Sequence, residues 1–100
     1  MDVIPQEIST TVDQPLDLIR LCLNEVVLVK MRSEREVVGK LHAFDQHLNM
    51  VLSDAEETVT IAEFEESQCE DVFKQVKRII PMLFLRGDSV ILVSPLLKTT

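Results

Sequence analysis

The spacing of apolar residues changes along the chain from a helical period to an extended one. Residues 1–12 are polar and show no sustained period, which predicts a flexible tail. Leu16, Ile19 and Leu23 then follow at helical spacing, behind a proline that suits the first turn of a helix. These positions predict a short helix of about 9–10 residues that begins at residue 13 or 14.

Beyond this helix, apolar and polar residues alternate with the period of two that β-strands show. The extended segments lie at residues 26–32, 36–45, 48–53 with a continuation at 57–61, 79–85 and 90–93. Gly39 indicates a sharp bend or a close backbone approach, and Pro81 indicates an edge strand or a strand start. A mainly β, barrel-like sheet with the helix over one end accommodates all of these elements.

Residues 63–78 depart from this pattern because charged residues dominate them. An acidic block is followed by a basic one, and the charged residues are Glu63, Glu65, Glu66, Glu70, Asp71, Lys74, Lys77 and Arg78. Runs of charge are usually solvated. We therefore expect a solvated insertion, with room for a helical turn, between the third and fourth strands. The folded domain would span residues 13–95, and residues 96–100 would form a C-terminal tail.

The length, hydrophobic content and net charge of the chain limit the classes of protein to which it can belong. The chain has 100 residues, of which 46% are hydrophobic and only four are aromatic, so one domain with an aliphatic core is expected. The net charge of −7 argues against a module that holds nucleic acid on a broad basic surface. No apolar run approaches the ~20 residues of a membrane span, and the first ten residues show no secretory signal.

The two cysteines point to no special chemistry. Cys22 and Cys69 lie far apart in the sequence, and no CxxC pair or Cys/His cluster accompanies them. Zinc sites need closely spaced ligand pairs, and small secreted domains need more than one disulfide. We expect two reduced thiols in an intracellular protein, with Cys22 packed on the helix and Cys69 in a loop.

Two stretches of the chain, EVVGKLHAFDQHLNMVL at residues 36–52 and IPMLFLRGDSVILV at residues 80–93, each contain a short polar turn between apolar segments. The first stretch resembles the first Sm motif of the Sm-like (LSm) proteins, and the second resembles their second motif. The leading PLDLIRL matches the N-terminal helix of that fold. The resemblance covers most of the chain, from Pro15 to about Pro95. It implies the Sm fold, in which a short N-terminal helix precedes a strongly bent five-stranded antiparallel sheet that forms an open barrel.

The resemblance also implies assembly into six- or seven-membered rings, in which the fourth strand of one subunit pairs with the fifth strand of its neighbour. The residues agree with this independently, because both faces of the last two strands are apolar. Exposed apolar edges of this kind predict edge-to-edge assembly. The expected interface residues are Leu83, Phe84, Leu85, Val90, Ile91, Leu92 and Val93.

An RNA site in two loops, at residues 45–49 and 86–88, is a further implication of the resemblance. His47 would stack on a base, and the planar guanidinium of Arg86 would stack on or bracket the other face of that base. His47 stands where many family members have Phe or Tyr, and its smaller ring stacks less well.

Three further loop residues complete the implied site. Asn49 would present its amide to the edge of uracil, and Asp45 would hold Asn49 or its loop in place. Gly87 would let the backbone approach the nucleotide, within a tight turn where glycine supplies a positive φ. Singly, these residues also suit ordinary turns, and it is their joint spacing that favours RNA.

The implied function is that of a non-catalytic subunit of a heteroheptameric LSm ring that binds uridine-rich RNA 3′ ends. One such ring is nuclear and binds U6 small nuclear RNA in pre-mRNA splicing; the other is cytoplasmic and promotes mRNA decapping and decay. The implied partners are other LSm subunits and uridine-rich RNA, with no cofactor, metal, membrane or small-molecule substrate. The isolated chain could also form a homo-oligomeric ring.

Two alternatives stay open at this stage. The chain could be a mainly structural ring subunit with little direct RNA contact, because a ring of different subunits need not use every site equally. It could also be an enzyme, with Asp45, His42, His47 or Asp54 as an acid–base group. No nucleophile or phosphate-binding glycine loop accompanies these groups, which disfavours catalysis.

Overall fold

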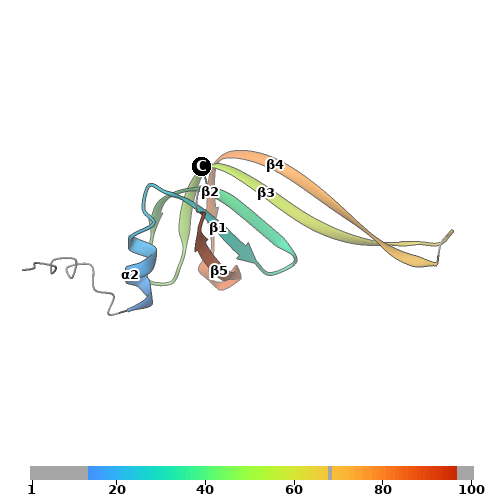
Figure 1. Cartoon of the computed structure of the whole chain (residues 1–100), viewed down its shortest axis with the longest axis horizontal. Coiled ribbons are helices and arrows are strands. Elements are labelled where there is room, and N and C mark those ends of the chain that lie inside the picture. Colours follow the sequence, from blue (N-terminus) through green and yellow to red (C-terminus); the bar gives the residue numbers. More distant parts are fainter. Residues whose placement is uncertain (1–13, 68, 97–100) are drawn as a thin grey trace, which may run out of the picture.

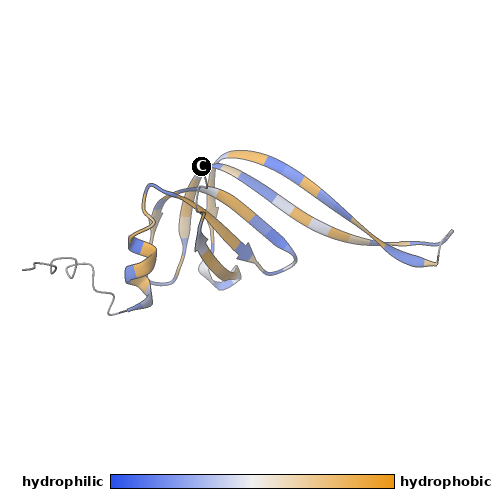
Figure 2. Ribbon diagram, viewed as in Figure 1, coloured by the Kyte–Doolittle hydropathy of each residue, from blue (hydrophilic) through white to orange (hydrophobic). Residues whose placement is uncertain are grey.

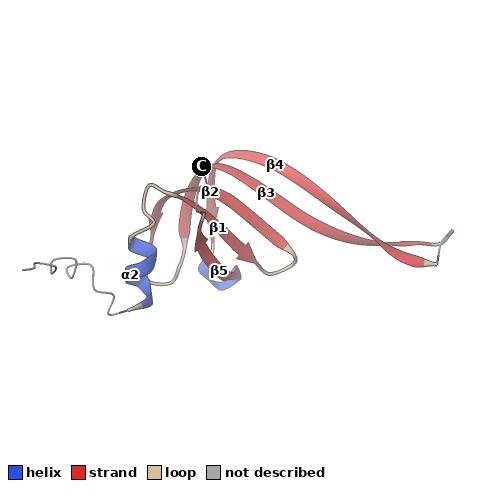
Figure 3. Cartoon of the chain, viewed as in Figure 1, coloured by secondary structure: helices blue, strands red, loops and turns tan. Residues whose placement is uncertain are grey.

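A computed structural model describes residues 14–67 and 69–96 of the chain. Its elements are the helix α2 (Pro15–Arg20), the strands β1 (Val26–Met31), β2 (Arg35–Phe44), β3 (Met50–Glu65), β4 (Glu70–Leu85) and β5 (Val90–Pro95), and the short 3-10 turn η1 (Gly87–Ser89). Strands make up most of the molecule (Figures 1 and 3). The predicted fold, a short helix before a bent five-stranded antiparallel sheet, is confirmed.

Some predictions fall outside this part of the chain. The predicted tail at residues 1–12, a helix start at residue 13, and residues 97–100 of the predicted C-terminal tail lie beyond the described residues. Within residues 14–67 and 69–96, no helix is long and apolar enough to cross a membrane.

The helix α2 is shorter than predicted, with six residues. Its start is capped by Asp17, whose Oδ2 accepts a hydrogen bond from the Gln14 backbone N–H at 3.1 Å. Beyond its end, the Cys22 N–H donates to the Ile19 carbonyl, which lies only three residues back. Asn24 then adopts a φ of 67°. A tightened turn followed by a left-handed residue ends the helix earlier than the apolar spacing suggests.

The strands follow the order β4-β3-β2-β1-β5, so β4 and β5 are the two edges of the sheet. Strong bends interrupt the regular pairing of β2 with β3, which shifts register near Gly39. A Cβ at Gly39 would lie 3.1 Å from the Ser53 carbonyl oxygen, which confirms the predicted close approach. Past a left-handed residue at Asp54, the third strand continues as predicted. Pro81 lies inside β4, so the edge position is confirmed but the strand start is wrong.

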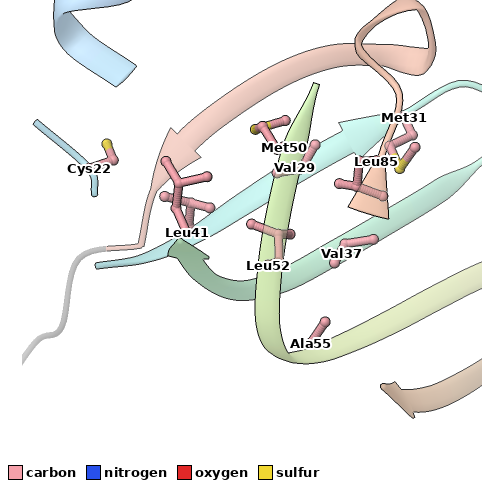
Figure 4. Close-up of a cluster of buried hydrophobic side chains, with 10 residues drawn as sticks. Cys22, Val29, Met31, Val37, Leu41, Met50, Leu52, Ala55 and Leu85 are labelled. Atoms are coloured by element: carbon pink, nitrogen blue, oxygen red, sulfur yellow. The ribbon is translucent and has the colours of Figure 1, made fainter. Parts of the chain in front are cut away.

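An aliphatic core fills the concave side of the bent sheet. Figure 4 shows Leu41, Met50 and Leu52 among its members. The complete cluster is Cys22, Val27, Val29, Met31, Val37, Leu41, Met50, Leu52, Ala55 and Leu85. Cys22 is buried while Cys69 lies exposed in the β3–β4 turn, and both are free thiols. Burial raises the pKa of the Cys22 thiol.

Several residues of the predicted subunit interface pack in or against the core instead. Leu85 is only 3% exposed and belongs to the core, so its side chain is not available to a neighbouring subunit. Three other predicted interface residues, Leu83, Val90 and Val93, pack partly against the same core. The remaining three, Phe84, Ile91 and Leu92, are exposed. The apolar side chains of the last two strands are therefore divided between the core and the exposed surface.

Residues 63–78 do not form a separate insertion, and they contain no helical turn among the residues that the structure describes. Residues 63–65 belong to β3 and residues 70–78 belong to β4, which pair in register out to Glu65 and Glu70. Figure 1 shows this long hairpin reaching away from the rest of the sheet. The alternating Val72 and Val76 sustain the strand period among the charges, and Lys74 forms a cross-strand ion pair with Glu63 at 3.1 Å.

A buried carboxylate stands at the base of this hairpin. Glu57 on β3 is 2% exposed and lies between two arginines from the neighbouring strands. Arg78 Nε on β4 donates to Glu57 Oε1 at 2.9 Å, and Arg78 Nη2 contacts the same oxygen. Arg35 Nε on β2 lies 3.1 Å from Glu57 Oε2, without the alignment of a hydrogen bond. This cluster joins three strands at the point where the hairpin leaves the sheet.

Candidate functional site

The two loops that the sequence analysis singled out leave the sheet side by side. Residues 45–49 connect β2 to β3, and residues 86–89 connect β4 to β5. The first residue of β3, Met50, pairs directly with the last residue of β4, Leu85. The strand pairing therefore sets the distance between the loops before any loop contact forms.

Asp45 organises the first loop through hydrogen bonds to its carboxylate. Its Oδ1 accepts from the His47 backbone N–H at 2.8 Å and from the Asn49 backbone N–H at 3.0 Å. Its Oδ2 accepts from the Asn49 side-chain Nδ2 at 2.9 Å. The Asn49 side chain, followed by these backbone N–H groups, lowers the pKa of Asp45, since all of them stabilise its charged form.

Asn49 connects the first loop to the second. Its Oδ1 accepts a hydrogen bond from the Gly87 backbone N–H at 2.7 Å, while its Nδ2 is held by Asp45. An amide has two hydrogens on nitrogen and two lone pairs on oxygen, so Asn49 keeps one donor and one acceptor for another group. The chain Asp45–Asn49–Gly87 thus fixes the relative position of the loops.

Gly87 is needed because the first loop occupies the space beside it. A Cβ at Gly87 would stand 1.6 Å from the His47 carbonyl oxygen and 2.9 Å from the Leu48 carbonyl carbon. The predicted positive φ is wrong, because neither glycine has one, and Gly87 begins the 3-10 turn η1 instead. The absent side chain permits an approach between two segments of the same protein.

His47 and Arg86 have exposed side chains that take no part in the hydrogen bonds between Asp45, Asn49 and Gly87. The Arg86 side chain is 75% exposed, and its Nη2 lies 3.4 Å from Asp88 Oδ2. The His47 ring lies beside the Gln46 amide, with 3.4 Å between their Nε2 atoms. The structure therefore brings Asp45, Asn49 and Gly87 into contact, and leaves an imidazole and a guanidinium on the surface of the two linked loops.

The structure adds two features that the sequence analysis missed. Leu48 adopts a φ of 65°, an uncommon conformation for a leucine and one that its residue type does not signal. A shallow hollow of about 210 Å³ lies beside the loops and is lined by Ala43, Phe44, Asp45, Asn49, Val51 and Phe84. The apolar faces of the last two strands predict Phe84 only as an interface residue. Among residues 14–67 and 69–96, no group of three or more His, Cys, Asp or Glu side chains could hold a metal ion.

The order of the first loop should depend on pH through Asp45. Because the folded pKa of Asp45 is lowered, its hydrogen bonds are fully formed above the pKa of an ordinary aspartate. They are lost as the pH falls through the lowered value. The amide NMR signals of His47 and Asn49 should report this transition, and Asp45→Asn should remove it. Signals that titrate at the pKa of an ordinary aspartate would contradict the hydrogen-bond arrangement.

Comparisons with known proteins place the chain in a family. Residues 17–95 match the family described as the LSM domain. The chain is 59% identical over 90 residues to a Dictyostelium discoideum protein named "Probable U6 snRNA-associated Sm-like protein LSm3". The aligned region covers 90% of this chain and 93% of that protein.

Solved structures give the same result. The fold matches a Pyrococcus abyssii Sm protein in complex with a uridine heptamer, with a TM-score of 0.62, 33% identity, and 84% and 100% of the two chains covered. A heptameric archaeal Sm protein matches with a TM-score of 0.57 and 32% identity, over 79% of this chain and 96% of that one. The motifs, the bent five-stranded sheet and these similarities agree, and the chain belongs to the LSM-domain family.

Proposed function

We propose that this chain is a non-catalytic subunit of a heteroheptameric LSm ring, of the third-subunit type, and that it binds uridine-rich RNA 3′ ends. The observation that carries the proposal is the Asp45–Asn49–Gly87 hydrogen-bond chain, which joins two loops and leaves His47 and Arg86 exposed on them. The names of its relatives support the proposal, since one is U6 snRNA-associated and another was solved with a uridine heptamer.

Each side chain has a role in this proposal. His47 and Arg86 stack on the two faces of a base, and stacking contributes ~1–3 kcal/mol per base. The free donor and acceptor of Asn49 match the acceptor and donor on the edge of uracil. Asp45 and Gly87 position Asn49. One subunit alone binds weakly, and a ring that holds successive nucleotides strengthens binding through effective concentration.

The acidic net charge is compatible with this function because of where the acids lie. Five of the carboxylates fall between residues 63 and 71, around the tip of the hairpin, whereas the two loops lie at the opposite ends of β3 and β4. In this subunit the contact with RNA needs one arginine and one histidine rather than a broad basic surface.

The cellular role follows from the same proposal. The U6-associated name of the Dictyostelium relative supports a nuclear ring that acts in pre-mRNA splicing. The resemblance to the LSm proteins supports a second, cytoplasmic ring that acts in mRNA decapping and decay. We accordingly propose that the chain occurs in both the nucleus and the cytoplasm, with other LSm subunits and uridine-rich RNA as its partners.

The direct RNA contact can be tested in the assembled ring. Combining His47→Ala with Arg86→Ala should weaken binding of oligouridine at least about tenfold, because it removes both stacking groups. Fluorescence anisotropy of a labelled oligouridine measures this change. Arg20→Ala, which removes an exposed arginine on α2, is the matched control and should leave the affinity unchanged. If the double variant binds like the wild type, the chain is instead a mainly structural ring subunit.

Assembly through the sheet edges has a separate test. Leu92→Asp should reduce the purified chain to monomers, because it places a charge on the exposed apolar surface of the edge strand β5. Native mass spectrometry measures the assembly. Leu92 is preferable to Leu83, since Leu83 packs against the core and its replacement would also lower the stability of the fold. Leu18→Asp, on the exposed face of α2, should leave the assembly intact, and rings that survive Leu92→Asp would contradict the assigned edge.

A further inference from the structure

The outer half of the β3–β4 hairpin lacks a third strand. Pairing of β2 with β3 extends only to Arg35 opposite Val59, whereas pairing of β3 with β4 continues to Glu65 opposite Glu70. Residues 60–65 and 70–75, here called the outer ribbon, therefore form a two-stranded projection (Figure 1). Two strands without a hydrophobic face packed on another layer are marginally stable, and such a projection gains from a partner that covers it.

One side of the outer ribbon carries two exposed aromatic rings. Residues directly opposite each other in an antiparallel pair project to the same side. Ala62 lies opposite Phe73, and Phe64 lies opposite Asp71, so these four residues share one side, here called the phenylalanine face. Phe64 is 63% exposed and Phe73 is 70% exposed. Figure 2 shows apolar positions continuing along the hairpin among polar ones.

The proposed ring would leave the phenylalanine face uncovered. A neighbouring β5 strand has six residues, whereas β4 has sixteen. The expected interface residues on β4 are at positions 83–85, at the end of the strand that is far from the outer ribbon. A partner for the phenylalanine face must therefore come from outside the strand pairing of the ring.

Charge around the ribbon tip indicates what that partner carries. Residues 63–71 contain five carboxylates and neither lysine nor arginine. Among these acids, within residues 14–67 and 69–96, only Glu63 forms an ion pair, and its partner is Lys74. The tip is therefore strongly negative, which repels a phosphate backbone and attracts a cationic segment. Asp71 places one of these charges directly on the phenylalanine face.

We propose that the phenylalanine face docks a segment of a partner protein that carries both apolar side chains and lysine or arginine. The apolar side chains cover Phe64 and Phe73, because buried aromatic rings contribute a large share of binding energy at protein interfaces. The cationic groups lie against Asp71 and the other carboxylates of the tip. The contact is separate from the two RNA loops, so it allows a ring bound to RNA to hold a second protein.

Fluorescence anisotropy with the full chain and labelled synthetic peptides tests this proposal. The probe is a 12-residue peptide that alternates Arg with Leu, and the comparison peptides alternate Glu with Leu and Arg with Ser. The wild type should bind the Arg/Leu peptide at least tenfold more tightly than either comparison peptide. Combining Phe64→Thr with Phe73→Thr should lower this affinity at least tenfold, and rising salt should weaken it.

A control variant and several outcomes separate this proposal from others. Ile79→Thr removes an apolar side chain of equal exposure, 71%, about 20 Å along β4 from Phe73, and should leave peptide binding unchanged. The double variant should keep its thermal unfolding temperature and its oligouridine affinity. Equal binding of all three peptides, or unchanged binding by the double variant, would overturn the proposal. A loss of self-association in the double variant would also overturn it, since the occupant would then be a second copy of this chain.

Discussion

Gly87→Ala is expected to separate the two loops and to reduce oligouridine binding of the assembled ring more than tenfold. The added Cβ would stand 1.6 Å from the His47 carbonyl oxygen, far inside van der Waals contact. One loop must then move, which breaks the 2.7 Å hydrogen bond from Gly87 to Asn49. Overpacking of this kind costs about 1–3 kcal/mol of folding free energy. Chemical denaturation measures the stability change, and anisotropy measures the RNA affinity.

Gly39→Ala provides a matched control for that substitution. A Cβ at Gly39 would lie 3.1 Å from the Ser53 carbonyl oxygen, so its neighbours must yield by only a few tenths of an ångström. The variant should therefore change stability less than Gly87→Ala and leave RNA affinity unchanged, because Gly39 is not part of either loop. If the two variants bound RNA equally well, the close approach of Gly87 to the first loop would have no functional role.

Replacing both Arg35 and Arg78 with methionine should strongly lower the free energy of unfolding. The change leaves the Glu57 carboxylate, now 2% exposed, without either of its cationic partners. Stranding a buried charge costs about 3–5 kcal/mol, and we expect the lower end because both arginines are partly exposed to solvent. Urea denaturation monitored by circular dichroism measures this loss.

A further substitution at Glu57 should restore the stability that the two arginine replacements remove. Adding Glu57→Leu to the two arginine replacements removes the stranded charge and should restore most of the stability, since apolar residues of similar volume often replace a buried ion cluster without cost. Each single arginine replacement should cost less than the pair, because the other arginine still faces the carboxylate. A triple variant as unstable as the double variant would show that arginine packing, rather than the charge of Glu57, holds the hairpin base.

The fold was predictable because one period dominates each element. Val27, Val29 and Met31 alternate with partly or fully exposed residues, and all three lie in the core. The charged stretch at 63–78 was harder to interpret as two strands. In a two-stranded ribbon only every second residue needs to be apolar, and here Glu63 and Lys74 occupy two of the positions where an apolar residue is expected. The ion pair between these two side chains replaces an apolar cross-strand contact, which a hydrophobic pattern cannot reveal.

The residues of the candidate site came from the resemblance to the LSm proteins, and their contact with RNA stays a prediction. The resemblance implied that Asp45 would hold Asn49 or its loop in place, and hydrogen bonds from Asn49 to Asp45 are present. Nothing in the sequence indicates that Asn49 also receives the Gly87 N–H, because that bond joins segments 38 positions apart. Leu48 shows the same limit, since a leucine does not signal the positive φ that it adopts here.

The position of β5 beside β1 has a consequence for how the chain reaches its native state. Val27 pairs with Pro95, so β5 joins the sheet beside β1, the strand farthest from it in the sequence. Contacts between such distant segments form slowly, because a long loop must close before they are made, whereas the β1–β2 and β3–β4 hairpins are local. During folding, β1 therefore has an open edge until residues 90–95 pair with it. This open edge makes the form without a paired β5 the species most dependent on a chaperone or on a waiting partner subunit.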